Sequence, residues 1–418
     1  MRKLHPHHDG RHAKPTDMSS YTIEKVDSPS RVKEFHNLPL LIYAGNRYWV
    51  HPLEDDIESR FDPKRNKLFA DGEAQRWIVR DADRRVVGRI AAFYNREIAN
   101  NYEQPTGSCG FFESIDDQAV ADLMFDTARD WLKERGMEAM DGPVNFGDRD
   151  QWWGLLVEGY ELQPLYGCNY HPPYYRDLFE NYGFLNYFNQ YTYLRNIVTG
   201  AFPESVYDRM KRLEESPGYR FEHVDKKDLE QFADDFRLIY NKAWAMFTGV
   251  KPIEKEDVQK LMRKIRPIMD ERLIYFAYFN DEPIGFFIMI PDLNRVLGAL
   301  KGKMNWFNGL RLLLLLRFSK KADRIFGVTF GVTPEFQGKG IESGMICAFE
   351  KMVASGTLKR YKTLELAWIG DFNPVMMRVV ENYVCARKHK RHVTYRYLFD
   401  RNKPFTRCPR LGGAKRKG

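Results

Sequence analysis

The chain has 418 residues, of which 65 are Lys or Arg and 57 are Asp or Glu, so its formal net charge is +8. A domain usually takes about 150 residues, so this length predicts two domains. Hydrophobic residues make up 43% of the chain and aromatic residues 14%, which supplies apolar surface for packed cores and excludes general disorder. The five cysteines are far apart and form no Cys-x-x-Cys pair, which argues against zinc and favours a reducing cytoplasm.

The N-terminal residues 1–18 are polar and hold four of the ten histidines, so we expect a leader without regular structure rather than a signal peptide. A metal-binding tract is the less favoured reading of these histidines. The first structured pattern begins at Tyr21, and a start at Met18 is an alternative to Met1. The longest aliphatic run, 312–316, is far shorter than the ~20 residues that a membrane span needs.

Two halves of the chain repeat one α/β order. Each half shows two strands joined by a polar turn, a third strand, a helix, a fourth strand, a second helix and a last strand. The expected strands are 77–79, 86–92, 109–112, a strand closed by 141–143, and 191–194, then 275–278, 284–289, 326–332, 363–366 and 394–398. The expected helices are 120–132, 172–182, 343–353 and 375–383. Both second helices end in Glu-Asn-Tyr, which indicates a tandem duplication with a linker near 200–217.

One glycine-rich turn, Val332 to Ile341, joins a strand to a helix and carries the sharpest local signal. Such a turn aims unpaired backbone N–H groups and the helix dipole at one point, where a phosphate can bind. Gly338 and Gly340 allow close approach, and Lys339 adds positive charge. An ordinary strand–helix turn is the alternative, and the Walker and dinucleotide patterns are absent.

This turn resembles the acyl-coenzyme A binding motif of the GNAT superfamily of N-acyltransferases. Gln337 and Gly340 match two fixed positions, whereas Glu342 stands where Gly or Ala is usual. The resemblance implies that the acyl-CoA site consists of Phe330, Val332, Gln337, Gly338, Lys339, Gly340, Ile341 and Asn373. It also implies that Val380 occupies the place of the tyrosine that many such enzymes use as general acid. In the first half, acidic residues from Phe112 to Asp117 replace the glycine turn, so we expect that half to have lost coenzyme A binding.

Further sequence segments, spread over about 23–399, resemble the bacterial ceramide synthase-like family of tandem GNAT proteins. They are 87–92, 110–112, 141–146, 154–160, 169–175, 291–294, 365–368 and 371–373. This resemblance implies transfer of a long acyl chain from acyl-CoA, or acyl carrier protein, to the amine of a sphingoid base. It implies no permanently bound cofactor and no metal; acyl-CoA is a co-substrate.

Acyl transfer to an amine needs a base, because free amines are mostly protonated at pH 7. Glu365 and Asp292, both at expected strand ends, are the candidate catalytic residues, and a backbone N–H near Val332 is the candidate oxyanion donor. A structural role is the alternative for each: Glu365 pairs with Arg396 or another cation, and Asp292 caps a turn. Without a Cys-His or Ser-His pattern, we expect direct transfer.

Positive charge gathers at 301–324, at 387–391 and at the C-terminal end, which suits an anionic partner. Since no nucleic-acid motif is present, an acyl carrier or a membrane surface is the better partner. Aromatic and leucine residues at 306–316 fit peripheral contact with the inner membrane face, although a core helix is the alternative. Likewise, the dense aromatics from 152 to 193 fit either an apolar groove or ordinary packing.

The sequence therefore predicts a cytoplasmic α/β protein with two tandem GNAT-like domains, each a mixed central sheet flanked by helices. The expected division is a leader at 1–18, a degenerate GNAT-like domain at 19–200, an acyl-CoA-binding domain at 205–400 and a basic tail at 401–418. Two other functions stay open: acetylation of a small amine, and a degenerate GNAT protein that binds without catalysis.

Overall fold

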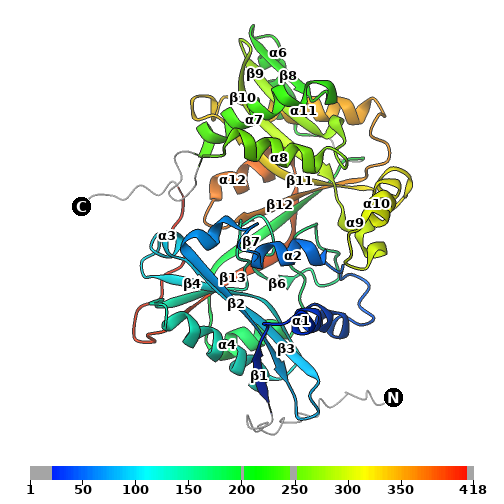
Figure 1. Cartoon of the computed structure of the whole chain (residues 1–418). Helices are drawn as coiled ribbons and strands as arrows, with labels where there is room; N and C mark the ends of the chain where they lie inside the picture. The colour runs from blue at the N-terminus through cyan, green and yellow to red at the C-terminus, as the bar shows by residue number, and fades with distance from the viewer. Residues whose placement is uncertain (1–20, 199–201, 245–251, 412–418) are drawn as a thin grey trace, which may run out of the picture.

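A computed structural model describes residues 21–198, 202–244 and 252–411, and its thirteen strands form one sheet (Figure 1). The strand order is β1-β2-β3-β4-β5-β13-β7-β12-β11-β10-β9-β8, and β6 pairs with β13 off this path. The predicted leader and residues 412–418 of the predicted tail lie outside the described residues. No helix in the described ranges has the length and apolar character needed to span a bilayer.

The first half contains seven strands and five α-helices. Its strands are β1 (Thr22–Lys25), β2 (Gly72–Arg80), β3 (Val86–Asn95), β4 (Thr106–Ser114), β5 (Ala139–Gly142), β6 (Leu155–Glu158) and β7 (Leu185–Asn196). Its helices are α1 (Pro29–Ile42), α2 (Glu54–Phe61), α3 (Arg96–Ala99), α4 (Gln118–Lys133) and α5 (Tyr175–Tyr182). The α4 helix forms as its apolar spacing predicts: Val120, Met124 and Ala128 are fully buried. Gly183, with φ 107°, ends α5 in the left-handed region that favours glycine.

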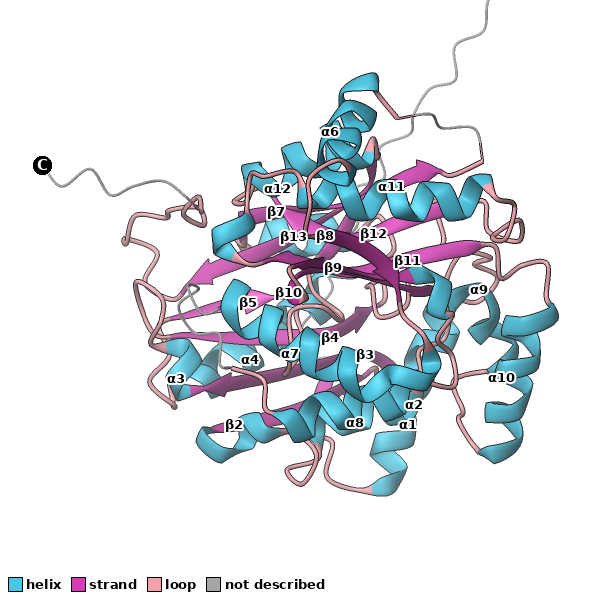
Figure 2. Ribbon diagram, turned by 90° about the horizontal axis from the view of Figure 1, so that it is seen from above, coloured by secondary structure: helices cyan, strands magenta, loops and turns pink. Residues whose placement is uncertain are grey.

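The second half repeats the pattern with six strands. These are β8 (Tyr219–His223), β9 (Ile274–Phe279), β10 (Glu282–Pro291), β11 (Arg324–Val332), β12 (Thr363–Gly370) and β13 (Arg387–Leu398). Its α-helices are α6 (Glu204–Glu214), α7 (Leu229–Trp244), α8 (Lys255–Ile265), α9 (Asn294–Leu297), α10 (Trp306–Phe318), α11 (Ile341–Ala354) and α12 (Pro374–Val379), and a π-helical turn, Val380–Val384, follows α12. Figure 2 shows α6 and α11 on one side of the β8–β11 strands and α7 and α8 on the other.

The predicted linker at 200–217 is not an extended connection, because α6 occupies most of it. Val206 and Leu213 of α6 are buried in the second core, against residues such as Ile341 of α11. The helix period in this segment places these apolar residues on one face, and packing of that face stabilises the helix.

The last strand of each half lies beside the other half. β7 pairs antiparallel with β12, and β13 pairs antiparallel with both β5 and β7. Side chains follow the same exchange: Val393, Tyr395 and Tyr397 of β13 are buried in the first core, while Tyr193 of β7 is buried in the second. The predicted division at 200–205 therefore stays a prediction about sequence repeats, since hydrogen bonds and cores cross it in both directions.

A buried ion pair fastens β13 to the first half. Arg396 donates two hydrogen bonds to Asp141 of β5, at 2.6 and 2.8 Å, and both side chains are buried. The Arg396 guanidinium also lies 3.6 Å from the ring centroid of Tyr187. Removing one member of such a pair leaves the other charge buried without its partner.

We predict that Arg396→Met lowers the free energy of unfolding by about 3–5 kcal/mol. Chemical denaturation followed by circular dichroism measures the loss. The matched control is Lys403→Met, because the Lys403–Glu138 pair also joins the C-terminal end to the first half but is half-exposed. It should cost no more than about 1 kcal/mol. Equal losses in the two variants would contradict the importance of burial.

Candidate functional site

An apolar cleft opens where β11 and β12 separate. The two strands pair in parallel from Arg324 to Gly327 and from Thr363 to Leu366, and then diverge as β12 continues along β7. The opening holds a cavity of about 230 Å³. Its lining comes from β10, β11, β12 and α12 with the following turn: Phe287, Gly327, Val328, Thr329, Phe330, Leu366, Ala367, Trp368, Ile369, Gly370, Phe372, Asn373, Met376, Val379 and Val380. Such a lining suits an extended apolar ligand.

The glycine turn lies between β11 and α11. Gly338 and Gly340 have φ values of 76° and 89°, and a Cβ at Gly338 would meet no atom within 4 Å. In the described part of the chain, no side chain caps the N-terminus of α11. The first-turn N–H groups have no side-chain cap, and the helix dipole favours negative charge there. The α6 helix lies beside this end, since a Cβ at Gly340 would come within 4 Å of Leu213 and Arg209. This geometry fits the phosphate-type turn that the sequence indicates.

The remaining predicted site residues fall in three places. Phe330 and Asn373 line the cleft, and the Asn373 side chain also accepts a hydrogen bond from Met376 N–H at the start of α12. Val332 and Ile341 are buried in the second core. Gln337 donates from its side chain to the Val332 carbonyl at 3.1 Å, which fixes the turn. Their roles toward a ligand stay predictions.

Lys339 and Glu342 give the turn opposite charges. The ammonium of Lys339 lies 4.7 Å from the ring centroid of Phe336. Glu342, in the first turn of α11, is half-buried, and this burial raises its pKa. The carboxylate that the sequence marked as a departure thus lies at the uncapped helix end, where it opposes an incoming phosphate.

Both candidate bases belong to one buried ion cluster beneath the cleft. Arg324 donates to Asp292 at 2.6 and 2.8 Å and to Glu365 at 3.1 Å. Lys390 of β13 donates to the other oxygen of Glu365. Asp292 and Glu365 have no exposed surface. The cluster joins β10, β11, β12 and the exchanged strand β13.

The environment of Glu365 favours its charged form. Burial by itself raises the pKa of Glu365, but the charges of Lys390 and Arg324 outweigh it, and the pKa lies below its ordinary value. Burial lowers the pKa of Lys390, although Glu365 opposes that effect. Leu366 and Ala367, which follow Glu365 in β12, line the cleft, whereas Glu365 itself does not. The buried carboxylate therefore lies below the residues that form the cleft floor.

Sequence reasoning missed Arg324 and Lys390. The alternative in which Glu365 pairs with Arg396 is wrong, because Arg396 pairs with Asp141. The alternative in which Glu365 pairs with another cation agrees with its contacts to Arg324 and Lys390. Lys390 lay within a basic run read as an anion-binding surface, yet its side chain is buried. The signal was present in the alternation of β13, where Lys390, His392 and Thr394 all point inward.

The first half closes the corresponding opening. Asp117 accepts a hydrogen bond from Ala119 N–H and thereby caps α4, which occupies the position of α11. Glu113 is buried and accepts hydrogen bonds from Tyr43 and Tyr175, both at 2.8 Å. The Val144 carbonyl lies so close to Gly110 that a Cβ there would approach it to 1.6 Å. These contacts narrow the first-half opening, and the cavity that remains beside Phe111, Phe112 and Glu113 of β4 is smaller than the cleft of the second half.

A smaller cavity of about 50 Å³ lies within the first half, because all of its lining residues come from 49–171. Val50, Arg89, Glu113, Cys168 and His171 are among its lining residues. Cys168 packs against the cluster of Leu165, Ile290 and Phe326, and so do Val328 and Ala367 of the large cleft, so this cluster lies between the two cavities. The aromatic residues predicted to form a groove, such as Trp152, are packed side chains on this wall.

The fold matches solved GNAT proteins along nearly the whole chain. A tandem GNAT protein from the clavulanic acid biosynthesis pathway matches with a TM-score of 0.51 at 11% identity, covering 92% of this chain and 100% of that one. The GCN5-related glucosamine N-acetyltransferase region of a fungal multi-domain GH3 β-N-acetylglucosaminidase matches with a TM-score of 0.52 at 12% identity, covering 92% of this chain and 38% of that one. The chain therefore has the tandem GNAT fold, as its sequence predicted.

Sequence relatives are more specific. The chain is 29% identical over 370 residues to the bacterial ceramide synthase of Caulobacter vibrioides (strain NA1000 / CB15N), covering 86% of this chain and 93% of that protein. It is 23% identical over 389 residues to protein YghO of Escherichia coli (strain K12), covering 91% and 96%. No family model matches. The chain thus shares the tandem GNAT fold and is similar in sequence to a protein named bacterial ceramide synthase, which confirms the resemblance read from its sequence.

We predict that Glu342→Ala strengthens binding of acyl-CoA to the glycine turn. Removing one repulsive charge at about 4 Å in water is worth about 1 kcal/mol, or roughly fivefold in Kd. Isothermal titration calorimetry with coenzyme A measures it. Glu335→Ala, a change of the same charge in the preceding turn, is the control and should have the smaller effect. Weaker binding by the Glu342 variant would contradict the proposed phosphate position.

We also predict an acid sensitivity that arises in β13. His392 is buried, its Nε2 donates to the Asn169 carbonyl at 3.0 Å, and burial lowers its pKa to about 4. Because an unfolded histidine titrates near 6.5, the unfolded state binds the extra proton first. Stability is fully present above about pH 6.5 and falls as the pH drops toward 4. Urea midpoints across this window should fall less steeply for His392→Gln; an unchanged slope would exclude His392 as a source.

Proposed function

We propose that this chain transfers a long acyl group from the thioester of acyl-CoA, or of acyl carrier protein, to the amine of a sphingoid base. The observation that carries the proposal is the cleft between β11 and β12, which is open beside an uncapped helix and a glycine turn in the second half. Similarity to a protein named bacterial ceramide synthase over 93% of its length supports the lipid acceptor.

The donor binds along β11. Its pyrophosphate lies at the first turn of α11, where N–H groups and Lys339 supply positive charge. Its pantetheine arm follows the strand edge freed by the divergence of β11 from β12. The acyl chain then enters the apolar cleft between Phe330 and Met376. Each part of the donor thus meets a surface of matching polarity.

The acceptor approaches from the side of the first half. Residues 163–168 of that half lie over the ion cluster: Arg324 donates to the carbonyls of Gln163 and Pro164, and Asp292 accepts from Tyr166 N–H. The first half, whose own opening is filled, serves as the acceptor-side wall. This role explains why a half without a phosphate turn is retained.

The reaction is a direct acyl transfer. The neutral amine nitrogen attacks the thioester carbonyl carbon, and the carbon–sulfur bond breaks. The thiolate takes a proton and leaves as coenzyme A thiol. The nitrogen loses its extra proton. Glu365 accepts that proton directly or through water. A covalent thiol intermediate is disfavoured, because burial raises the pKa of Cys168, next to the cleft, to about 12.

Mass spectrometry tests the proposal with purified protein, palmitoyl-CoA and sphinganine. The expected products are the N-acyl sphingoid base and one equivalent of free thiol. Turnover with acetyl-CoA and a small amine, without turnover of palmitoyl-CoA, would assign the chain instead to small-amine acetylation. Absence of coenzyme A binding by both the natural protein and Glu342→Ala would assign it to the non-catalytic class, which Val380 in the place of the general acid favours.

We predict that Glu365→Gln lowers kcat by about 10²–10⁴-fold, the range typical of a lost general base. Acyl-CoA affinity should change little, because Glu365 lies below the cleft floor. Asp141→Asn is the control, since it also removes a buried carboxylate paired with arginine but lines neither of the two cavities. If both variants lose activity in proportion to thermal stability, Glu365 acts only through structure.

A further inference from the structure

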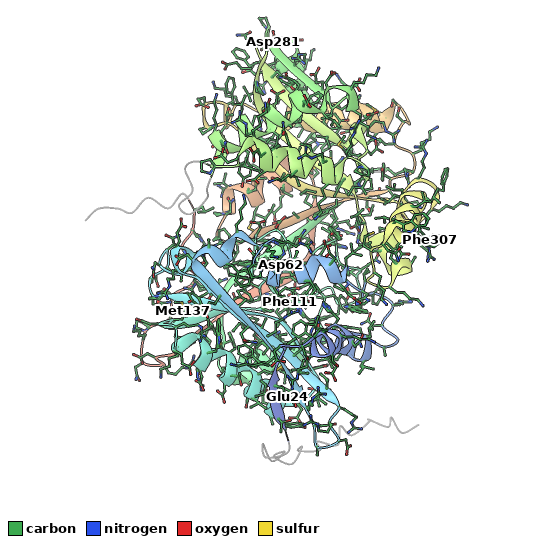
Figure 3. The ribbon with its side chains drawn as sticks, in the orientation of Figure 1. Glu24, Asp62, Phe111, Met137, Asp281 and Phe307 are labelled. Carbon is green, nitrogen blue, oxygen red and sulfur yellow. The ribbon has the colours of Figure 1, made fainter. Side chains whose placement is uncertain are left out.

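The α10 helix presents large apolar side chains to solvent. The exposed fractions are 82% for Trp306, 60% for Phe307 and 73% for Phe318, and Leu310 and Leu314 are each 50% exposed. Their spacing, at i, i+4, i+8 and at i, i+7, i+11, gathers them on one broad face. Figure 3 shows Phe307 at the outer edge of the molecule, pointing away from it. Contiguous exposure of this kind marks an interaction surface.

The opposite side of α10 is anchored. Leu312 and Leu316 are buried against α9 and against Val50 and Leu53 of the first half. The Asn305 side chain accepts from Asn308 N–H and caps the helix. The alternatives of a core helix and an exposed helix are therefore both partly right: two leucines hold the helix in place, and the rest of its apolar surface has no cover within the described residues.

Six cations border the exposed face. Lys301, Lys303, Arg311, Arg317, Lys320 and Lys321 are all exposed, and within the described part of the chain none of them forms an ion pair. The sequence has no acidic residue from 301 to 322. Apolar residues on the outer face with lysine and arginine around them are the composition of a helix that lies in a membrane interface.

We infer that α10, with its flanking segments 301–305 and 319–321, docks this protein on an anionic lipid bilayer. The aromatic side chains insert at the level of the headgroups, and the six cations contact lipid phosphates. A second copy of the chain fits less well, because a twofold interface through this face would place like charges opposite one another.

The docking surface is continuous with the proposed acceptor side. Val50, which packs under α10, lines the small cavity, and so does Cys168. Cys168 packs against the cluster of Leu165, Ile290 and Phe326, and so do Val328 and Ala367 of the large cleft. A lipid amine that leaves the bilayer beside α10 therefore has a path toward the cleft that is lined by apolar side chains together with Arg89, Glu113 and His171. This second step rests on the proposed function, whereas the docking itself does not.

Vesicle flotation tests the docking without any turnover. The full chain should float with vesicles of phosphatidylglycerol mixed equally with phosphatidylcholine, and much less with phosphatidylcholine alone. Trp306→Ser/Phe307→Ser/Phe318→Ser should weaken the partition coefficient by more than about tenfold, and so should Lys320→Gln/Lys321→Gln. The control, Leu40→Ser/Leu41→Ser, removes exposed leucines from α1 and should bind like the natural protein.

Equal flotation of all four proteins, or none with anionic vesicles, would overturn the inference. Light scattering on the same samples tests whether a second copy of the chain binds this face instead. If the natural protein is a dimer that does not bind vesicles, and only the α10 aromatic variant is a monomer, the face is assigned to a second copy. Acyl transfer to a micellar sphingoid base reports on the proposed function separately, because detergent supplies the acceptor without a bilayer. Loss of vesicle binding with retained micellar activity would leave the proposed function intact.

Discussion

The exchange of the last strands, β7 and β13, is the constraint on which the rest of the structure depends. Each strand completes the sheet and core of the half that it does not belong to. β13 consequently brings Lys390 beneath β12, where it meets Glu365, and brings Arg396 to Asp141 of the first half. A tandem protein with two separate sheets would have neither contact. The cleft and its polar floor are therefore products of the joined sheet.

The ion cluster of Asp292, Arg324, Glu365 and Lys390 shows the energetic logic of that junction. The free-energy cost of burying each charge is offset only by the partners that it contacts, because a buried ion without a partner costs several kcal/mol. Arg324 reaches both carboxylates and also donates to two carbonyls of the first half. The same contacts hold Glu365 ionised directly below an apolar cleft. One set of interactions thus stabilises the junction and keeps Glu365 in its charged form, and by lowering its pKa it also reduces the basicity of the carboxylate.

Local sequence patterns predicted the elements, because strand alternation, helix spacing and glycine turns are properties of neighbouring residues. They predicted the glycine turn and the duplicated order, and they placed Asp292 directly after a strand, where it lies. The expected place of Glu365 at a strand end is wrong, because β12 continues to Gly370. Pairings between distant segments were beyond their reach: Glu365 and Lys390 are 25 residues apart, and Arg396 and Asp141 are 255 apart. The α6 helix within the predicted linker at 200–217 was also missed, since a short amphipathic helix is stabilised mainly by packing, here on α11. The basic run at 387–391 was likewise predicted to be an exposed surface. Only the position of β13 inside the sheet shows that its alternate residues are buried.

The position of β13 near the end of the chain also has a consequence for biosynthesis. When residues 21–198 have left the ribosome, the open edge of β5 still lacks the strand that covers it, and Asp141 lacks its arginine. That edge stays available to wrong partners for the time needed to synthesise about 190 further residues, roughly ten to forty seconds at about 5–20 residues per second. The two halves therefore acquire their native form together, at the end of translation, and a premature stop before Arg387 removes the closing strand from the domain that was made first.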